Sequence, residues 1–235
     1  MQLLQRASAQ FQFGIWGRLH ANNYHSYYLS HSLFGEDMVV RALLPGIRNG
    51  FYVDIGAHHP VYSSNTFHFY ERGWRGINID ATPGSMDVFR LVRPRDINLE
   101  ACVAEQPGVA VKFFVFEDGL LNTMDPRTAQ EASERGLHPV KTVEMTTRTL
   151  TDVLRQYAPN TPIDYLNIDV EGLDESILRS IDWSGQRPTV ISFECHLDVR
   201  QGFQEVPALE FLASQGYEFQ AKCGSTLIVM RRDAR

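Results

Sequence analysis

The sequence has few cysteines, no long apolar run and no excess of basic residues. Its three cysteines, Cys102, Cys195 and Cys223, are too few and too scattered for a disulfide framework, which favours a reducing compartment, the cytoplasm. Because no run of 18 apolar residues occurs, we expect no membrane span. A formal net charge of -6 argues against a nucleic-acid partner, since nonspecific binding to phosphates needs a basic face.

The 235 residues, 43% of them hydrophobic and 21% charged, are sufficient for one domain with a full core. From residue 50 onward, short apolar segments alternate with segments of helical periodicity. This alternation predicts an α/β fold, Rossmann-like and doubly wound, with a mostly parallel sheet covered by helices on both faces. The expected strands are 50–56, 74–80, 95–104, 111–118, 163–172 and 188–196, and the expected helices are 64–73, 83–94, 150–158, 173–181 and 206–216.

The two ends of the chain depart from this alternation. Residues 217–232 predict a hairpin that turns at Cys-Gly-Ser, and therefore an antiparallel strand at one edge of the sheet. Residues 1–48 are rich in aromatics and contain apolar residues at helical spacing over 34–43. We expect an N-terminal helical extension over 1–48, which could form a lid over an acceptor site or a contact in a homodimer. Residues 49–235 would then form the catalytic domain.

The segment DIGAHHP, at the end of the first expected strand, contains an acid, a glycine and two histidines. Ligands of doubly wound sheets bind beyond the carboxyl ends of the strands, so Asp54, Gly56 and His58 are candidate ligand contacts. The second expected strand ends at Asp80, and an acid there can accept hydrogen bonds from both ribose hydroxyls. These residues together indicate a cofactor that contains a nucleoside. The alternative is that Gly56 only forms a turn and Asp80 only caps a helix.

The glycine-rich fingerprint of dinucleotide sites, G-x-G-x-x-G, is missing. His58 occupies the position of its second glycine, where an imidazole would obstruct a pyrophosphate lying against a helix N-terminus. S-adenosylmethionine contains a ribose but no phosphate, so it tolerates this residue. The sequence therefore favours a methyl donor over NAD, and it places His58 at the mouth of the cofactor site.

Four further polar residues follow two later strands. Asp169 and Glu171 end one expected strand, and Glu194 and His196 end the next. Residues two apart on a strand share a face, so these side chains converge if the two strands are neighbours. Asp169, Glu194 and His196 could then bind Mg²⁺ or another divalent cation or supply a general base. The alternative is that Glu194 and His196 form a buried pair that ties a strand to a helix.

Several segments, taken together, resemble the FkbM-type methyltransferases. They are FYVDIGAHHPVYSSNTFHFYERGWRGINIDATPG, IDYLNIDVEGLDESIL, ISFECH, SLFGEDMVVRALL and FEDGLLNT. Along the chain, these segments follow one another in the order typical of that family, and together they span roughly residues 30 to 230. The resemblance implies a class I methyltransferase that uses S-adenosylmethionine, with a seven-stranded sheet whose last strand is antiparallel. It also implies methylation of a hydroxyl group, often on a sugar or on a natural product such as a macrolide.

The resemblance also implies roles for individual residues. Asp54, Gly56 and Ala57 would line the methionine part of the donor, and Asp80 would hold its ribose. The adenine would lie near Glu100, Ala101 and Cys102, and Asp169 would stand where donor and acceptor meet. His58 departs from the general class I pattern, in which a glycine is commoner, but recurs in the subgroup with GAHHP. The acceptor would be a small molecule or a glycan.

A hydroxyl acceptor is a weak acid, so its methylation needs a base or a metal ion. We hypothesise that His196 or His58 takes the proton, while Asp169 and Glu194 orient the hydroxyl directly or through a divalent ion. One rival hypothesis is an NAD-dependent oxidoreductase on the same architecture, because a fold does not determine function. The other is a methyltransferase-like domain that binds without turnover, which a wide separation of Asp169, Glu194 and His196 would support.

Overall fold

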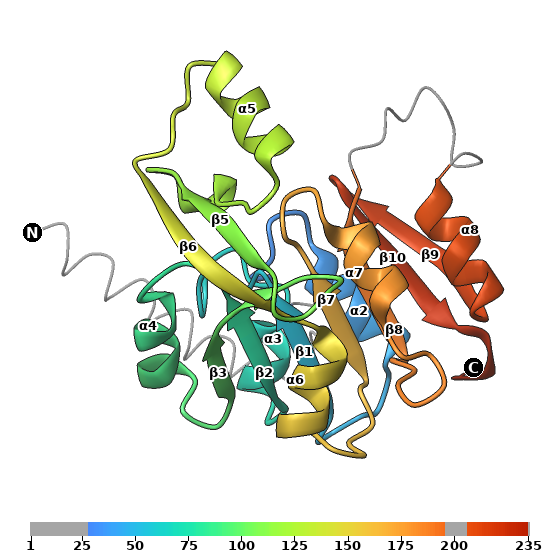
Figure 1. The fold of residues 1–235 in the computed structure, drawn as a ribbon. Coiled ribbons are helices and arrows are strands. Elements are labelled where there is room, and N and C mark those ends of the chain that lie inside the picture. The colour runs from blue at the N-terminus through green and yellow to red at the C-terminus, as the bar shows by residue number, and fades with distance from the viewer. Residues whose placement is uncertain (1–27, 196–205, 235) are drawn as a thin grey trace, which may run out of the picture.

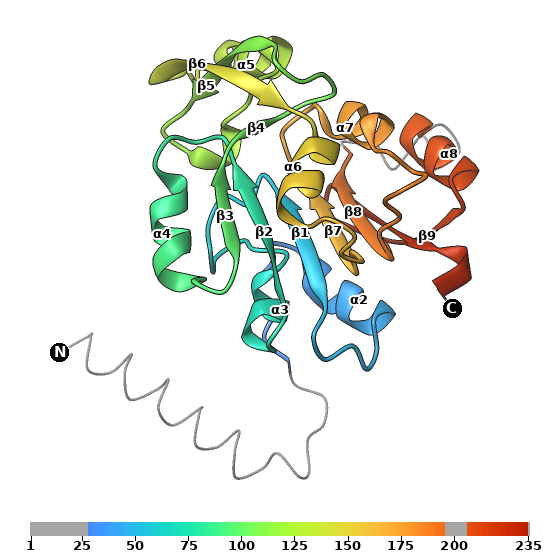
Figure 2. The ribbon, with the colours of Figure 1, turned by 60° about the horizontal axis from the view of Figure 1, so that its bottom comes forward.

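A seven-stranded sheet forms the centre of the molecule in the computed structural model, which describes residues 28–195 and 206–234. The strand order is β3-β2-β1-β7-β8-β10-β9, and Figure 2 shows most of these strands side by side. The α/β doubly wound fold predicted from the sequence is confirmed. The strands are β1 Phe51–Ile55, β2 Arg75–Asp80, β3 Ile97–Glu100, β7 Tyr165–Ile168, β8 Val190–Glu194, β9 Tyr217–Cys223 and β10 Thr226–Arg231.

The antiparallel strand of this sheet is β10, the last in the sequence. It pairs antiparallel with both β8 and β9, whereas β3, β2, β1, β7 and β8 pair parallel with one another. The predicted terminal hairpin is present as β9 and β10, and it gives antiparallel pairing at one end of the sheet, with β9 at the edge and β10 inside. The physical reason is burial: all of Thr226 to Met230 is buried, whereas β9 is mostly half-exposed, and an inner strand has both faces covered.

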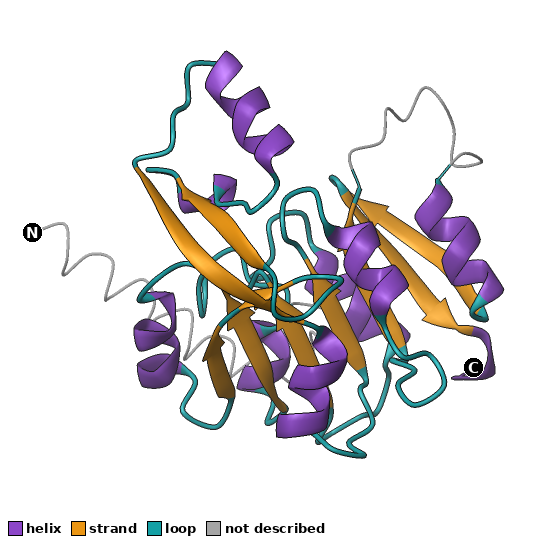
Figure 3. Cartoon of the chain, in the orientation of Figure 1, coloured by secondary structure: helices purple, strands orange, loops and turns teal. Residues whose placement is uncertain are grey.

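Helices cover both faces of the sheet (Figure 1, Figure 3). The apolar side chains of α6, α7 and α8 pack on one face, in a core with Val53, Ile77, Leu166 and Ile191. On the other face α2 and α3 pack around Tyr52 and Tyr165, and α4 lies against β3. The helices are α2 Glu36–Leu43, α3 Phe67–Glu71, α4 Ser85–Val92, α6 Leu150–Tyr157, α7 Asp174–Ser180 and α8 Pro207–Ser214.

Local sequence explains where α6 begins. The Thr149 hydroxyl accepts a hydrogen bond from the backbone N–H of Asp152 at 3.1 Å, which satisfies one of the free donors at the helix start. Leu150, Val153 and Leu154 are spaced so that they face the sheet, and all three are buried. Of the two threonines that could start this helix, Thr149 and Thr151, the first is the cap.

The sheet face under α3 and α4 contains a buried row of polar residues. Neighbouring strands in register place Asn98, Asn78, Asp54, Asn167 and Ser192 side by side across β3, β2, β1, β7 and β8. Four of the five are buried, and only Asn98 is half-exposed. Buried polar groups are costly unless they are hydrogen-bonded, so this row must pair internally. It leads directly to the site described below.

A lobe formed by residues 102–148 stands over one end of the main sheet (Figure 1, Figure 2). Its three-stranded sheet has the order β4-β6-β5. The extra strand predicted over 111–118 is present as β5, but the sequence analysis did not predict α5 or β6, since both are largely polar. The lobe consists of β4 Cys102–Val103, β5 Ala110–Val115, the 3₁₀ helix η1 Gly119–Leu121, α5 Pro126–Glu134 and β6 Lys141–Arg148.

The helix predicted over 34–43 is present as α2, and it packs directly on the sheet. Val40 and Leu44 lie in the same core cluster as Tyr52, Tyr165 and Ile228. Residues 1–27, the larger part of the expected extension, lie outside the described residues. Within the described part of the chain, no helix has both the length and the apolar character needed to cross a membrane.

Candidate active site

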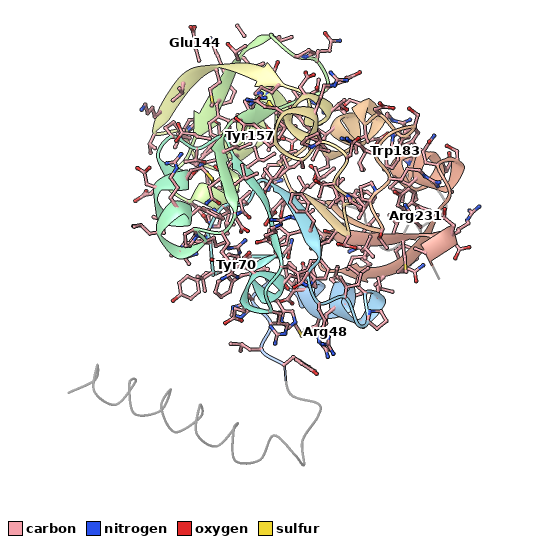
Figure 4. The ribbon with its side chains drawn as sticks, turned by 90° about the horizontal axis from the view of Figure 1, so that it is seen from below. Arg48, Tyr70, Glu144, Tyr157, Trp183 and Arg231 are labelled. Atoms are coloured by element: carbon pink, nitrogen blue, oxygen red, sulfur yellow. The ribbon has the colours of Figure 1, made fainter. Side chains whose placement is uncertain are left out.

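A cavity opens at the carboxyl ends of the parallel strands, where the lobe meets the main sheet. Glu144 on β6 marks the outer side of the lobe and Arg231 the opposite end of the molecule (Figure 4). Four segments from the strand ends line the cavity, together with polar residues of the sheet and side chains of the lobe. The lining residues are 54–58, Ser63, Asn65, 79–82, 101–103, Phe113, Gly119, Leu120, Asn122, Met124, Asn167 and 169–171.

Most residues predicted to bind the donor line this one cavity. Asp54, Gly56, Ala57, His58, Asp80, Ala101 and Asp169 all do. Glu100 is not among the lining residues, because its carboxylate turns away and accepts a hydrogen bond from the backbone N–H of Gly84 at 2.7 Å. Its neighbours Ala101 and Cys102 line the cavity in its place. The roles of these residues toward a donor stay predictions.

Gly56 allows the turn after β1 to touch the loop after β7. A Cβ atom at this position would lie 1.6 Å from the backbone oxygen of Asp169, and the φ angle of Gly56 is +80°. Both facts exclude a side chain, since left-handed backbone favours glycine and the approach leaves no space for another carbon. The backbone N–H of Gly56 donates to the oxygen of Ile79 at 2.9 Å, so this turn joins the ends of β1, β2 and β7.

His58 follows this turn in a left-handed conformation, with φ of 52°. Its backbone N–H donates to Oδ2 of Asp80 at 2.9 Å. Its ring extends toward the lobe, where a Cβ on Gly119 would lie 3.4 Å from Cε1 of His58. His58 therefore lies between the turn after β1 and the lobe.

The Asp80 carboxylate organises the loop around it. Besides the His58 N–H, it accepts hydrogen bonds from the Thr82 N–H at 2.7 Å and the Ser85 hydroxyl at 3.3 Å. The alternative that Asp80 only caps a helix is wrong, because the N-cap of α4 is Gly84 and no side chain caps that helix. Since each carboxylate oxygen has two lone pairs, Asp80 can still accept hydrogen bonds from a ligand in the cavity it lines.

Three carboxylates converge beside the cavity, which Asp169 and Glu171 line and Glu194 does not. One oxygen of each of Asp169, Glu171 and Glu194 lies within 4.8 Å of the others, as expected if β7 and β8 are neighbours, which they are. Glu194 also accepts a hydrogen bond from the Ser225 hydroxyl at 2.9 Å. His196, the fourth residue of this predicted group, lies outside the described residues. The structure therefore brings together the three carboxylates and says nothing of the imidazole.

Asp174, at the start of α7, is a fourth acid that the sequence analysis missed. It is buried, and Oδ1 accepts a hydrogen bond from the backbone N–H of Glu194 at 3.2 Å. The signal that could have identified it is its position three residues after Glu171, in the motif VEGLDE. Asp174 belongs to the same cluster as Asp169, Glu171 and Glu194, because it contacts Glu194 and its pKa responds to the Glu194 charge.

Crowding of these acids raises their pKa values. Burial, followed by repulsion from Glu194, raises the pKa of Glu171 to about 8 and that of Asp174 to about 7. Burial is also the main reason why the pKa of Asp169 is raised well above its usual range, with repulsion from Glu194 next. Like charges in a low-dielectric site cannot all ionise together. The cluster therefore holds protons near neutral pH, which suits a site that exchanges protons; a cation bound there would have to displace them.

The lobe fixes the loop that presents these carboxylates. The Thr123 hydroxyl donates to the backbone oxygen of Glu171 at 2.9 Å, and Nδ2 of Asn122 donates to the Thr82 hydroxyl at 2.9 Å. The pair Asn122-Thr123 thus holds both walls of the cavity, the loop after β7 and the loop after β2. The sequence identified the pair only as polar residues that could contact a ligand or cap a helix.

The raised pKa values predict how stability depends on pH in the ligand-free protein. Glu171 and Asp174 keep their protons up to about pH 8 and 7 in the folded state, against 4.5 and 3.8 ordinarily. Between these limits the folded state binds more protons than the unfolded state, so the free energy of unfolding should fall as the pH rises from about 4 to about 8. Urea denaturation at pH 5 to 9 measures this fall.

Glu171→Gln isolates the contribution of one carboxyl to this dependence. As the pH rises from 5 to 9, the free energy of unfolding of the variant should increase relative to that of the wild type by about 1–3 kcal/mol. A difference of one pKa unit between the folded and unfolded states corresponds to about 1.4 kcal/mol, and solvent screens part of the interaction that shifts the pKa. A difference between variant and wild type that is constant with pH would show that Glu171 titrates normally.

The strand order, the antiparallel β10 and the cavity at the strand ends define a class I methyltransferase fold. The chain belongs to the FkbM methyltransferase family, because the family model described as "Methyltransferase FkbM domain" matches residues 54–219, more than half of the chain. The family resemblance seen in the sequence is thereby confirmed. The match includes Asp54, Asp80, Asp169 and Glu194 but not the region before β1.

Solved structures with a similar fold are distant in sequence. A TehB-like SAM-dependent methyltransferase from Corynebacterium glutamicum is 14% identical, with 96% of this chain and 98% of that chain covered and a TM-score of 0.41. An O-methyltransferase from Bacillus cereus in complex with SAH is 12% identical, with 86% and 84% covered and a TM-score of 0.43. Likeness at this level indicates nothing about the reaction or the acceptor. No curated protein matches the chain.

Proposed function

We propose that this protein transfers the methyl group of S-adenosylmethionine to a hydroxyl group of a sugar or another natural product. The observation that carries the proposal is the pairing, in one cavity, of a donor-type turn at Gly56 with the carboxylates of Asp169 and Glu171. Gly56 lies directly against the Asp169 backbone, so a donor held by the turn would present its reactive end to the acids.

The residues around the turn suit a donor without phosphate. Asp54, Gly56 and Ala57 would hold its amino-acid end, Asp80 the ribose, and Ala101 with Cys102 the adenine; all of them line the cavity. His58 bridges from the turn to the lobe and occupies the space that a pyrophosphate would need. The geometry therefore supports an adenosyl donor better than NAD.

The acid cluster supplies what a hydroxyl acceptor needs. When bound, the donor supplies a methyl group on a positively charged sulfur, which keeps the C–S electron pair as the acceptor oxygen bonds to the methyl carbon. The chain must align the hydroxyl and accept its proton. Asp169 and Glu194 would orient the hydroxyl, and a carboxylate of the cluster, His58 or His196 would take the proton. Alignment contributes roughly 7–11 kcal/mol and a base about 10²–10⁴-fold.

The same carboxylates could act through a metal ion. Oxygen ligands from several acids suit Mg²⁺ and similar hard cations, and the described set is Asp169, Glu171 and Glu194. The sequence analysis named Asp169, Glu194 and His196 as the possible ligands. In the described part of the structure, Glu171 is the third acid beside Asp169 and Glu194. A wide separation of the predicted catalytic residues would have supported a domain that binds without turnover. Asp169 and Glu194 instead lie close together.

Thermal unfolding with S-adenosylmethionine, S-adenosylhomocysteine and NAD, each with and without Mg²⁺, tests the proposal. A ligand at 100 times its Kd adds about 2.7 kcal/mol of stability, which raises Tm by roughly 5–10 °C in a protein of this size. We expect this rise with both adenosyl ligands and none with NAD. Stabilisation by NAD alone would contradict the proposal, and an additional Mg²⁺-dependent rise would support the metal ion.

A pair of variants ties the shift to the cavity. Asp80→Ala removes the carboxylate predicted to hold the ribose and should abolish the rise in Tm. Asp87→Ala removes an exposed acid on α4 that only pairs with Arg90, and should preserve it. Methyl transfer from labelled donor to a panel of hydroxylated sugars, with methyl ethers of the same sugars as blanks, then identifies the acceptor. Transfer to the blocked sugars would exclude O-methylation.

A further inference from the structure

Arg93, the residue after α4, is a buried cation held only by neutral oxygens. Its side chain is completely buried, and among the described residues no carboxylate forms an ion pair with it. Its guanidinium donates to the Pro60 carbonyl at 2.8 Å, the Thr66 hydroxyl at 2.8 Å, the Ser64 hydroxyl at 2.6 Å and the Asn78 amide oxygen at 3.0 Å. A buried charge is costly unless an opposite charge compensates it. The acids that can compensate the charge of Arg93 lie one contact further away, behind the side chains that accept its hydrogen bonds.

Two acids, the buried Asp54 and the half-buried Asp96, lie one side chain away from Arg93. The Thr66 hydroxyl, which accepts from Arg93, donates to Oδ2 of Asp54 at 2.6 Å. On the other side, Asn78 accepts from Arg93 and donates to Asp96 at 3.0 Å. Burial raises the pKa of Asp54, and the positive charge of Arg93 together with the Thr66 hydrogen bond acts in the opposite direction.

Of these two acids, only Asp54 lines the cavity. Its carboxylate is fixed from two sides, since Oδ1 accepts from the Asn167 amide at 2.9 Å while Oδ2 accepts from Thr66. Each oxygen then still has a lone pair for a ligand. Asp54 is thus a buried anion with a defined orientation and remaining capacity to accept hydrogen bonds.

Arg93 also holds the loop that forms the adjoining wall. Its three contacts at Pro60, Ser64 and Thr66 are spread along the segment 60–66, and Ser63 and Asn65 of that segment line the cavity. The rings of Phe67, Tyr70 and Phe89 surround the guanidinium at 5.2–5.7 Å. Figure 4 labels Tyr70 on α3. These rings exclude water, and the resulting low dielectric strengthens the electrostatic interaction between Arg93 and Asp54.

We propose that Arg93 is a positioning residue which, through the Thr66 hydroxyl, fixes the Asp54 carboxylate as the anionic contact for the ammonium group at the amino-acid end of the donor. The proposal rests on the proposed function, and it adds two residues outside the strand-end motifs to the donor site. It predicts that the network acts on one end of the donor and leaves the adenosine end unaffected.

Thr66→Val tests this, because valine retains the shape of threonine and removes both hydrogen bonds of the relay. The probes are S-adenosylhomocysteine and 5′-methylthioadenosine, which shares the adenosine and thioether but lacks the ammonium and carboxylate. By isothermal titration, the Kd of S-adenosylhomocysteine should rise at least about tenfold, since a hydrogen bond to a charged group is affected. The Kd of methylthioadenosine should change less than about twofold, and Thr66→Ser should restore wild-type binding of both.

Thr147→Val is the matched control. Thr147 is buried and hydrogen-bonded to Gln106 and Val109 in the lobe, but does not line the cavity, so both ligands should bind as in the wild type even if Tm falls. Equal weakening of both ligands by Thr66→Val, or unchanged binding of S-adenosylhomocysteine, would overturn the positioning role. A wild type that binds neither ligand would instead reject the proposed function, and the relay with it.

A second variant keeps the proposal testable if Thr66→Val does not fold. Ser64→Ala removes one acceptor of Arg93, which is also the acceptor of the backbone N–H groups of Thr66 and Phe67, and it keeps the Thr66 hydroxyl. It should produce the same selective loss of S-adenosylhomocysteine binding, by a smaller factor. Equal effects on the two ligands, or no effect on S-adenosylhomocysteine, would again contradict a role at the ammonium end.

Discussion

Replacing Asp169 with Asn should lower kcat for methyl transfer by at least about 100-fold, the lower range for loss of a positioned acid or base. Asp169 lines the cavity beside Glu171, and its backbone oxygen lies against Gly56. Asparagine retains the shape of the side chain but cannot take up a proton. Because the substitution also removes an ionisable group whose charged form is disfavoured by burial and by repulsion from Glu194, Tm should be unchanged or higher.

Three measurements on purified Asp169→Asn separate chemistry from folding: kcat, the Kd of S-adenosylhomocysteine, and Tm. Glu175→Gln is the control, since Glu175 is an exposed acid on α7 that pairs with Arg179, and its kcat should equal that of the wild type. A kcat of Asp169→Asn within a few-fold of the wild type would remove Asp169 from the catalytic group. A fall in Tm would indicate that the carboxylate stabilises the fold instead.

Gly56→Ala should be the most disruptive single substitution in the donor end of the cavity. The added carbon would lie 1.6 Å from the Asp169 backbone oxygen, and no rotation of a side chain can relieve a clash with main chain. The loop after β7 must therefore move, which displaces the acid cluster. We expect Tm to fall by more than about 10 °C, the equivalent of several kcal/mol, and binding of S-adenosylhomocysteine to be lost.

Gly136→Ala distinguishes this clash from backbone strain. Gly136 has a similar φ of +86° but no atom within 4 Å of the added carbon, so it should cost only the strain of a left-handed residue, about 1–2 kcal/mol. That corresponds to a fall in Tm of roughly 2–8 °C. If Gly56→Ala were no more destabilising than Gly136→Ala and still bound the ligand, Gly56 would be only a turn residue.

The strand-end residues were predictable because their positions follow from local pattern. Asp54, Asp80 and Asp169 each stand at or just past the end of a short apolar segment followed by a helix, and parallel strands bring such ends to one edge of a sheet. Nothing beyond the alternation was needed to expect them in one cavity, and they all line it. Glu100 shows the limit of this argument, because its carboxylate turns to Gly84 and a strand end does not determine the direction of its last side chain.

Two elements of the lobe, α5 and β6, were missed because they are largely polar and exposed, so burial leaves little trace in their periodicity. The β6 segment KTVEMTTR and the α5 segment PRTAQEASE are mostly exposed or half-exposed. Their positions depend on contacts with residues far along the chain, such as the hydrogen bond from Thr123 to Glu171. No spacing within the lobe sequence encodes that partner.

By itself, the sequence determined the alternation of strands and helices, the family, and the acids and glycine at the strand ends, because periodicity and turn chemistry act over a few residues. Only the tertiary structure decided that β10 lies inside the sheet, that Asp174 joins the cluster, and that Arg93 reaches Asp54 through Thr66. These relations join segments that are remote in the chain, and burial of the core brings them together. Which side chains share a buried charge is therefore a property of the packed molecule.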